Sequence, residues 1–205
     1  MGHQSKTEFR TLHALRIKGF ATSVVLAEIT ALDHAKVEDH LGGLAGDGHA
    51  RFREARSLWQ LTPEGRESHV GHLGDDLLGA PIEPLGEHYT TFIEQNVEFK
   101  DLCGMWQLRD GEPNGHDDPK YDSEVIERLD DLHARARPIV GGFGDLFERM
   151  APYVVRLDGV LGRLRAGDAQ MFTGVMCGSY HDVWMELHED LIITQRIDRS
   201  AEGSF

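Results

Sequence analysis

The sequence of 205 residues is poor in cysteine and has no apolar run near 18 residues. Its two cysteines, Cys103 and Cys177, stand far apart and outside any CxxC spacing, so neither a disulfide framework nor a zinc knuckle is indicated. Buried small side chains are the default interpretation, and a redox sensor built on either cysteine is the alternative.

A membrane span is not expected, and the first residues, MGHQSKTEF, lack the apolar core of a signal peptide. We therefore expect a cytoplasmic protein.

Sequence motifs that carry catalysis are also missing. The chain has no GxSxG, no P-loop, no HExxH and no GxGxxG after a predicted strand. The nearest approach to a zinc-protease motif is His188-Glu189, which lacks the second histidine four residues from the first. We therefore expect a protein that is not an enzyme and that uses no cofactor.

Basic residues are few and unevenly distributed, and the formal net charge is −14. Residues 1–72 contain nine Lys or Arg and nine Asp or Glu, whereas residues 73–205 contain 12 against 26. The N-terminal part is thus neutral, and any contact with nucleic-acid phosphate is expected there. Together with the chain length, this change of composition predicts two domains, residues 1–72 and 73–205.

The most informative stretch of the sequence is residues 41–66, LGGLAGDGHARFREARSLWQLTPEGR. Glycines at 46 and 48 favour the end of a helix. The next residues alternate, with Ala50 and Phe52 on one side of a predicted strand and Arg51 and Arg53 on the other. After a polar turn the pattern resumes in LWQLT, and the dipeptide Thr62-Pro63 is typical of a new helix start. The order is helix, two-stranded hairpin, helix.

Upstream, the segments 7–19 and 22–30 have helical spacing of apolar residues, and a third helix is expected over residues 34–46. With these helices, residues 7–70 resemble the winged-helix domain of bacterial transcriptional regulators of the MarR type. The resemblance rests on Asp47-Gly48, Ala50-Arg51 and the run LTPEGR. It implies a winged helix-turn-helix that places the third helix in the major groove of DNA.

The expected DNA contacts are the basic side chains of this part of the chain. They are Arg16, Lys18, Lys36, His40, Arg51, Arg53 and Arg56. Such sparse basic residues suggest weak binding per monomer and hence a homodimer on double-stranded DNA. Glu38 and Asp39 of the third helix would repel phosphate, although a carboxylate can accept a hydrogen bond from a cytosine amine.

The rest of the chain predicts an all-α bundle of five or six helices with no strand, which makes the whole protein mainly α. Its longest helix is expected over residues 85–106, where apolar and aromatic residues recur every three or four positions. A stripe so wide needs burial inside a bundle or against a second subunit, and Asn96 within it needs a hydrogen-bond partner. A further helix starts after Asp118 and is expected to break or kink at Pro138.

Polar-tipped or polarisable side chains on or beside the apolar stripes suggest a pocket for an apolar or aromatic effector. The candidates are Phe99, Cys103, Trp106, His133, Tyr180, His181, Trp184 and His188. Core packing is the alternative for each of them. His181 and His188 lie two helical turns apart, too far to share a metal ion, and we expect none. A site across the bundle that includes His133, similar in architecture to helical sensor domains of some GntR-type regulators, is the alternative.

These expectations describe a one-component transcriptional regulator with DNA and an unidentified small molecule as partners. The alternative is a winged-helix module that binds another protein through its acidic helical part and does not bind DNA.

Overall fold

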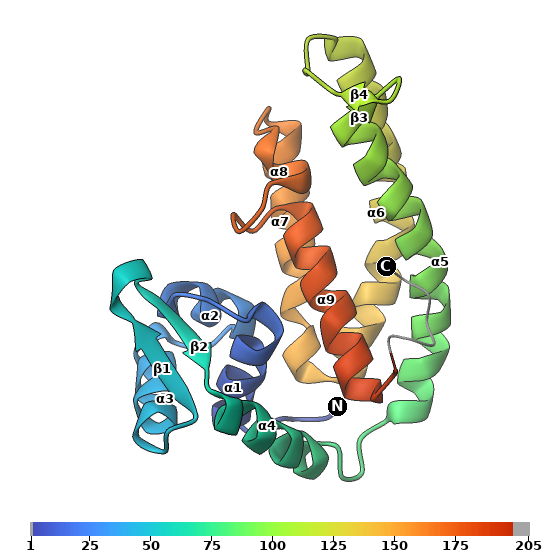
Figure 1. The fold of residues 1–205 in the computed structure, drawn as a ribbon. Coiled ribbons are helices and arrows are strands. Elements are labelled where there is room, and N and C mark those ends of the chain that lie inside the picture. The colour runs from blue at the N-terminus through green and yellow to red at the C-terminus, as the bar shows by residue number, and fades with distance from the viewer. Residues whose placement is uncertain (1, 199–205) are drawn as a thin grey trace.

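The computed structural model describes residues 2–198, and these residues form a mainly helical fold with two small antiparallel sheets (Figure 1). The mainly α class predicted from the sequence is confirmed. We call residues 7–76 the head. Its elements are α1 (Thr7–Lys18), α2 (Ser23–Thr30), α3 (His34–Gly46), β1 (Ala50–Arg53), a 3-10 turn (Glu54–Arg56), β2 (Leu58–Leu61) and α4 (Pro63–Asp76). The predicted order of elements in this part is therefore observed.

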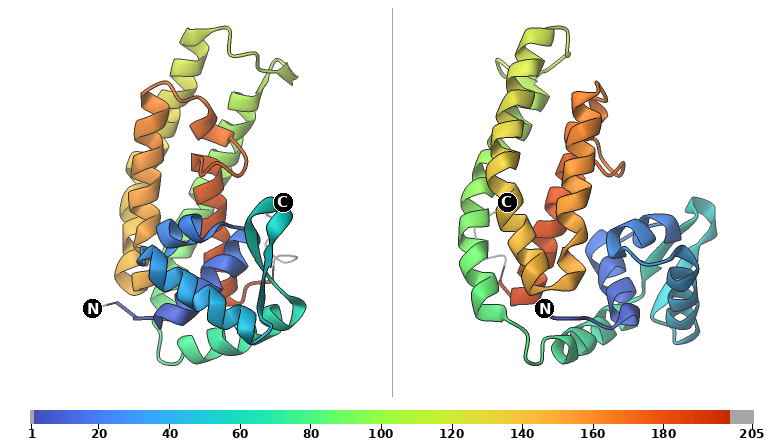
Figure 2. Two further views of the ribbon diagram at one scale, coloured as in Figure 1. Left: turned by 90° about the vertical axis from the view of Figure 1, so that its left-hand side faces the viewer. Right: turned by 180° about the vertical axis from the view of Figure 1, so that it is seen from behind.

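We call residues 82–195 the body. Its elements are α5 (Ile82–Gln107), β3 (Leu108–Arg109), β4 (Glu112–Pro113), α6 (Pro119–Leu146), a 3-10 turn (Glu148–Met150), α7 (Pro152–Arg165), α8 (Gln170–Thr173) and α9 (Tyr180–Gln195). The long helices α5 and α6 run side by side as a hairpin, and α7 and α9 pack beside them (Figure 2).

The start of α4 shows why the run LTPEG suits this place in the chain. The Thr62 hydroxyl accepts a hydrogen bond from the Gly65 amide at 2.9 Å and donates one to the Gly48 carbonyl at 2.8 Å. Pro63 occupies the first turn, where no intrahelical donor is needed. A Cβ at position 65 would lie 1.9 Å from the His49 carbonyl oxygen, so only glycine lets α4 approach the hairpin this closely.

Several predictions about the body were wrong in detail. Two short strands, β3 and β4, join α5 to α6, so the body is not wholly helical. Helix α6 continues through Pro138 to Leu146, which excludes a break at that residue, and its 28 residues exceed the 26 of α5, which was expected to be the longest helix. Packing along its length holds the helix together despite the lost amide donor. The predicted domain boundary at residue 72 falls inside α4, which ends at Asp76.

Head and body have separate hydrophobic cores. The head core contains buried residues between positions 12 and 61, and the body core contains buried residues between 85 and 192. Helix α1 lies against α9, and α2 lies against α7 (Figure 1). No helix within residues 2–198 has both the length and the apolar content that crossing a bilayer requires.

Candidate functional site

Helix α3 and the β1–β2 hairpin lie on the side of the head that faces away from the body (Figure 1). Asp33 caps α3 by accepting a hydrogen bond from the Ala35 amide at 2.9 Å. Val37 and Leu41 are fully buried against the head core, which fixes the orientation of the helix. The polar residues of its first two turns are therefore exposed. They are His34, Lys36, Glu38 and Asp39.

The hairpin places its arginines as the alternation predicted. Arg51 and Arg53 lie two positions apart in β1 and therefore share one face of the sheet, together with Gln60 and Leu58, which lie directly opposite them in β2. Arg53 also donates a hydrogen bond from Nε to the Gln60 side chain at 3.2 Å. Arg56 is exposed at the tip of the hairpin. Within residues 2–198, none of the three arginines forms an ion pair with a carboxylate.

The other face of the hairpin is only partly covered. Ala50 and Leu61 are buried, as expected, but Phe52 is 46% exposed and packs on the Trp59 ring, with centroids 5.3 Å apart. Trp59 also exchanges backbone hydrogen bonds with Ala21, which adds a third short segment beside β2. The hairpin is thus anchored at its base, while its tip projects into solvent.

Three of the expected DNA contacts do not lie on this surface. Arg16 pairs with Glu189 at 3.3 Å, and Lys18 pairs with Glu186 at 2.5 Å, so both basic groups are held by α9 of the body. The His40 side chain turns inward and shares a hydrogen bond of 2.9 Å with the Thr11 hydroxyl on α1. Sequence spacing could not show that the end of α1 meets an acidic helix about 170 residues later in the chain.

The contact between head and body is centred on Asp190, which is 2% exposed. Its Oδ1 accepts hydrogen bonds from His13 Nε2 at 2.9 Å, from Thr194 at 3.0 Å and from the Arg149 guanidinium. Its Oδ2 accepts one from the Tyr153 hydroxyl at 3.2 Å. A buried carboxylate is thus fully satisfied by donors from α1, α7, α9 and the turn before α7.

A pair of buried histidines extends this cluster into the head. His13 Nδ1 lies 2.9 Å from His69 Nε2 of α4. Because His13 donates its Nε2 hydrogen to Asp190, a neutral His13 must accept at Nδ1, and His69 must then donate from Nε2. The two rings also stack, with centroids 5.1 Å apart. This chain of hydrogen bonds links α4 to α9 through α1.

Burial governs the ionisation of this cluster. Desolvation, followed by the charge of His13, lowers the pKa of His69 to about 3. Desolvation also lowers the pKa of His13, against the opposing effect of Asp190. For Asp190, burial alone would raise the pKa, but Arg149 and His13 outweigh it and hold the pKa well below its usual range. Near neutral pH the cluster therefore contains neutral imidazoles beside a carboxylate–guanidinium pair.

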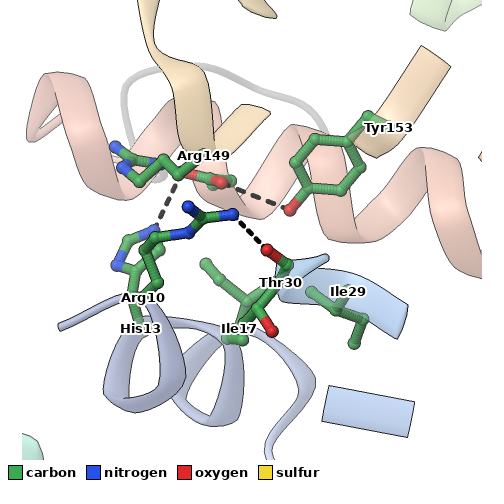
Figure 3. Close-up of a pocket in the computed structure, with 9 residues that line it drawn as sticks. Arg10, His13, Ile17, Ile29, Thr30, Arg149 and Tyr153 are labelled. Atoms are coloured by element: carbon green, nitrogen blue, oxygen red, sulfur yellow. Dashed lines mark hydrogen bonds and ion pairs between the residues drawn. The ribbon is translucent and has the colours of Figure 1, made fainter. Parts of the chain in front are cut away.

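Figure 3 shows the small cavity beside this cluster, where Arg10 and His13 of the head meet Arg149 and Tyr153 of the body. Its volume is about 20 Å³, which suits a single water molecule. Arg10 donates a hydrogen bond to the Thr30 carbonyl and pairs with Glu148 of the body at 3.5 Å. A cavity this small and polar serves the contact between head and body better than it would serve an organic ligand.

The structure brings most of the expected effector residues into the body core, where aromatic rings pack on one another. Phe99 lies 5.4 Å from Tyr180 and 4.9 Å from Trp184, measured between ring centroids. The Trp184 Nε1 donates to Asn96 at 2.9 Å, which supplies the partner that Asn96 needs. The Trp106 and Phe172 rings pack in a tilted arrangement, with centroids 4.7 Å apart. These contacts assign the rings to packing within the core.

The remaining candidates are also held by their neighbours. His133 lies 3.1 Å from the Tyr180 hydroxyl and 2.9 Å from Asp158, and desolvation lowers its pKa. His188 lies 3.4 Å from the Tyr89 hydroxyl. Burial raises the pKa of the Cys103 thiol to about 12, which leaves it unreactive. His181 differs, because it borders an open groove between head and body. Within the described residues, no cluster of histidine, cysteine and carboxylate side chains is arranged to hold a metal ion.

Sequence reasoning missed the cluster around Asp190 altogether. The signal that was available is an acidic residue on the apolar side of the last helix, since Asp190 adjoins Leu191 and Leu187 in its stripe. His13 likewise stands between Leu12 and Leu15 in α1. Polar residues at such positions need partners when buried, but the sequence alone does not identify those partners.

Comparisons of the chain with protein-family models, with curated proteins and with solved structures give no match.

Proposed function

We propose that the protein is a DNA-binding transcriptional regulator whose head is a winged helix-turn-helix. The observation that carries this proposal is the joint exposure of α3 and of three hairpin arginines on one side of the head. The order of three helices, a hairpin and a closing helix supports it, as does the backbone pairing of Ala21 with Trp59 beside the hairpin. In this arrangement α3 enters the major groove and the hairpin contacts the phosphate backbone.

The proposed DNA contacts are Lys36 from α3 and the hairpin residues Arg51, Arg53 and Arg56. Their guanidinium and ammonium groups supply the sequence-independent part of the affinity, because neutralised phosphates release bound counterions. The exposed carboxylates of Glu38 and Asp39 lie on the same helix. They disfavour phosphate and suit a position within the groove, where a carboxylate can accept from the amine of cytosine.

Replacing Arg51 and Arg53 together by alanine should weaken binding to every DNA sequence. We expect the slope of log affinity against log salt concentration to flatten by about two units per bound protomer, one for each lost phosphate contact. The measurement is a fluorescence-anisotropy titration of a duplex from the region upstream of the gene, repeated at several salt concentrations.

The matched control replaces Arg163 and Arg165, two exposed arginines on α7 of the body that pair with Asp168 and Asp130. This control removes the same charge far from the proposed interface, and the salt slope should stay as in the unmodified protein. An equal change of slope in both double variants, or no change in either, would contradict the assignment. The absence of DNA binding by the unmodified protein would favour the alternative of a protein-interaction module.

We also propose that the regulator acts as a homodimer. Four basic contacts on one head are few for useful affinity at physiological salt, and two copies double them across a palindromic site. The apolar stripe of α5, for which burial against a second subunit was one expectation, is buried within one chain, so the dimer must use another surface. Multi-angle light scattering at micromolar concentration should give twice the mass of the chain. A monomer at that concentration, both free and on DNA, would refute this part of the proposal.

A further inference from the structure

A groove of about 460 Å³ runs between the head and α9 of the body. This volume lies in the range of small-molecule sites. Ile17, Lys18 and Phe20 form its wall on the head. The wall on the body comes from α9 and from Met176 in the loop before it. A molecule bound here would contact both parts of the protein.

The apolar side chains of the groove are Ile17, Phe20, Met176 and Met185. Phe20 is 44% exposed and Met176 is 66% exposed, so both present apolar surface that the chain itself leaves uncovered. Flexible thioether side chains adapt to ligands of different shape, and an open aromatic ring attracts a cation to its face.

Most charges around the groove are already neutralised in pairs. Glu186 lies between Lys18 at 2.5 Å and Arg156 at 2.6 Å, and Glu189 pairs with Arg16 at 3.3 Å. Asp182 differs from these carboxylates, because its oxygen Oδ2 accepts only from the backbone amides of residues 177 and 178, each at 3.0 Å. It forms no ion pair with any residue in the part of the chain that the structure describes. Among the three carboxylates of the lining, Asp182 is therefore the one with which no basic side chain of residues 2–198 pairs, whereas three basic side chains pair with the other two.

We propose that this groove binds a small organic cation, namely an amine attached to an apolar or aromatic body. The ammonium group would lie near Asp182 and the face of Phe20, and the apolar part would pack on the two methionines and Ile17. His181 borders the groove beside Asp182 and adds a polar side chain to its lining.

Such a ligand would alter the contact between head and body, because the groove is lined by the same Lys18–Glu186 pair that joins them. This regulatory consequence rests on the proposed DNA-binding function, whereas binding of the cation does not. The groove then serves as the effector site in place of the aromatic core.

The test is calorimetric titration of the full chain, without DNA, with three probes that share one apolar body. They are 4-phenylbutylamine, 4-phenylbutanol and 4-phenylbutyrate, which are cationic, neutral and anionic at pH 7. We expect the amine to bind about fivefold more tightly than the alcohol, as for an exposed ion pair, and the carboxylate to bind most weakly. Equal affinity for the three probes, or no binding of any at millimolar concentration, would overturn the proposal.

Variants locate the site within the protein. Phe20→Ala should weaken binding of the amine about three- to tenfold, through the lost cation–π contact and apolar area. Phe52→Ala is the matched control, since it removes an aromatic side chain of similar exposure from the hairpin, and it should leave the affinity unchanged. Asp182→Asn should remove the preference for the amine over the alcohol while an amide oxygen still accepts from the backbone. Equal effects of Phe20→Ala and Phe52→Ala would contradict this location.

A DNA titration with and without the amine then separates the two proposals. If the amine binds as expected but the protein does not bind DNA, the proposed DNA-binding function is wrong and the proposal of a cation site in the groove is retained. If DNA binds and no probe does, the groove proposal fails alone.

Discussion

Replacing Asp190 by alanine should lower the free energy of unfolding by about 3–5 kcal/mol, the usual cost of removing one partner from a buried ion pair. The carboxylate is 2% exposed and serves four donors at once. Its loss leaves the Arg149 guanidinium, whose side chain is only 3% exposed, with the more distant Asp76 carboxylate at 3.9 Å as its remaining ion-pair partner. In the same step His13 loses the acceptor of its Nε2 hydrogen, and Tyr153 keeps only the Glu186 carbonyl at 3.4 Å. Urea unfolding at pH 7.5, followed by circular dichroism, measures the change.

The matched control is Asp130→Ala, which removes a carboxylate from an exposed pair with Arg165 on the body. Exposed pairs contribute little, so the expected loss is below about 1 kcal/mol. Asp190→Asn adds a second comparison, because the amide oxygen can still accept from His13 while the negative charge is gone. The loss of unfolding free energy in Asp190→Asn should lie between the losses in the other two variants. Equal losses for Asp190→Ala and Asp130→Ala would show that the buried cluster does not stabilise the contact between head and body.

The elements that the sequence predicted well depend on local chemistry. Thr62 caps α4, Asp118 caps α6, and α3 covers residues 34–46, because a cap and its amide partner lie within three residues of each other. The alternation in β1 likewise set the register that places Arg51 and Arg53 on one face. For such features a short window of sequence contains all the groups that interact.

The features that were missed depend on pairs far apart in the chain. His13 and Asp190 are separated by 177 positions, and nothing near either residue indicates the other. Arg16 and Lys18 looked available for phosphate for the same reason, because their acidic partners lie on α9. The charge asymmetry of the chain was a partial indication of these ion pairs. An acidic body beside a neutral head repels nucleic acid, and it also provides carboxylates that pair with the basic residues of the head.

The aromatic residues of the body illustrate a different difficulty. Phe99, Tyr180 and Trp184 have the composition of a ligand site, yet their rings fill the space between the helices. Composition on a helical stripe cannot distinguish rings that line a cavity from rings that pack on each other. The groove beside α9 lacked a sequence signal, since its two walls come from residues 17–20 and 176–189.

Acidification should weaken the contact between head and body through the two buried histidines. In the unfolded chain both imidazoles titrate near pH 6.5, whereas in the folded protein burial and the adjacent His13 hold the pKa of His69 at about 3. Between these values the unfolded chain binds more protons, so the free energy of unfolding rises with pH. The contribution of neutral His69 is thus fully present above about pH 7.5 and is lost as the pH falls from 6.5 toward 3. His13, whose pKa is also lowered by desolvation, acts in the same direction.

The expected slope is about 1.4 kcal/mol per pH unit for each histidine that stays neutral in the folded state, between pH 6 and 4.5. Asp190 acts at lower pH. Because its folded-state pKa is depressed, its contribution to stability stays intact until the pH falls below the pKa of an ordinary aspartate.

Urea unfolding at pH 7.5, 6.0 and 5.0 measures this slope of unfolding free energy against pH. His69→Gln, whose amide can still donate to His13, should reduce this slope by the contribution of one histidine. His72→Gln, on the exposed face of the same helix α4, should keep the slope of the unmodified protein. If both variants behave alike, the pH dependence arises outside the buried pair, and the cluster has no part in it.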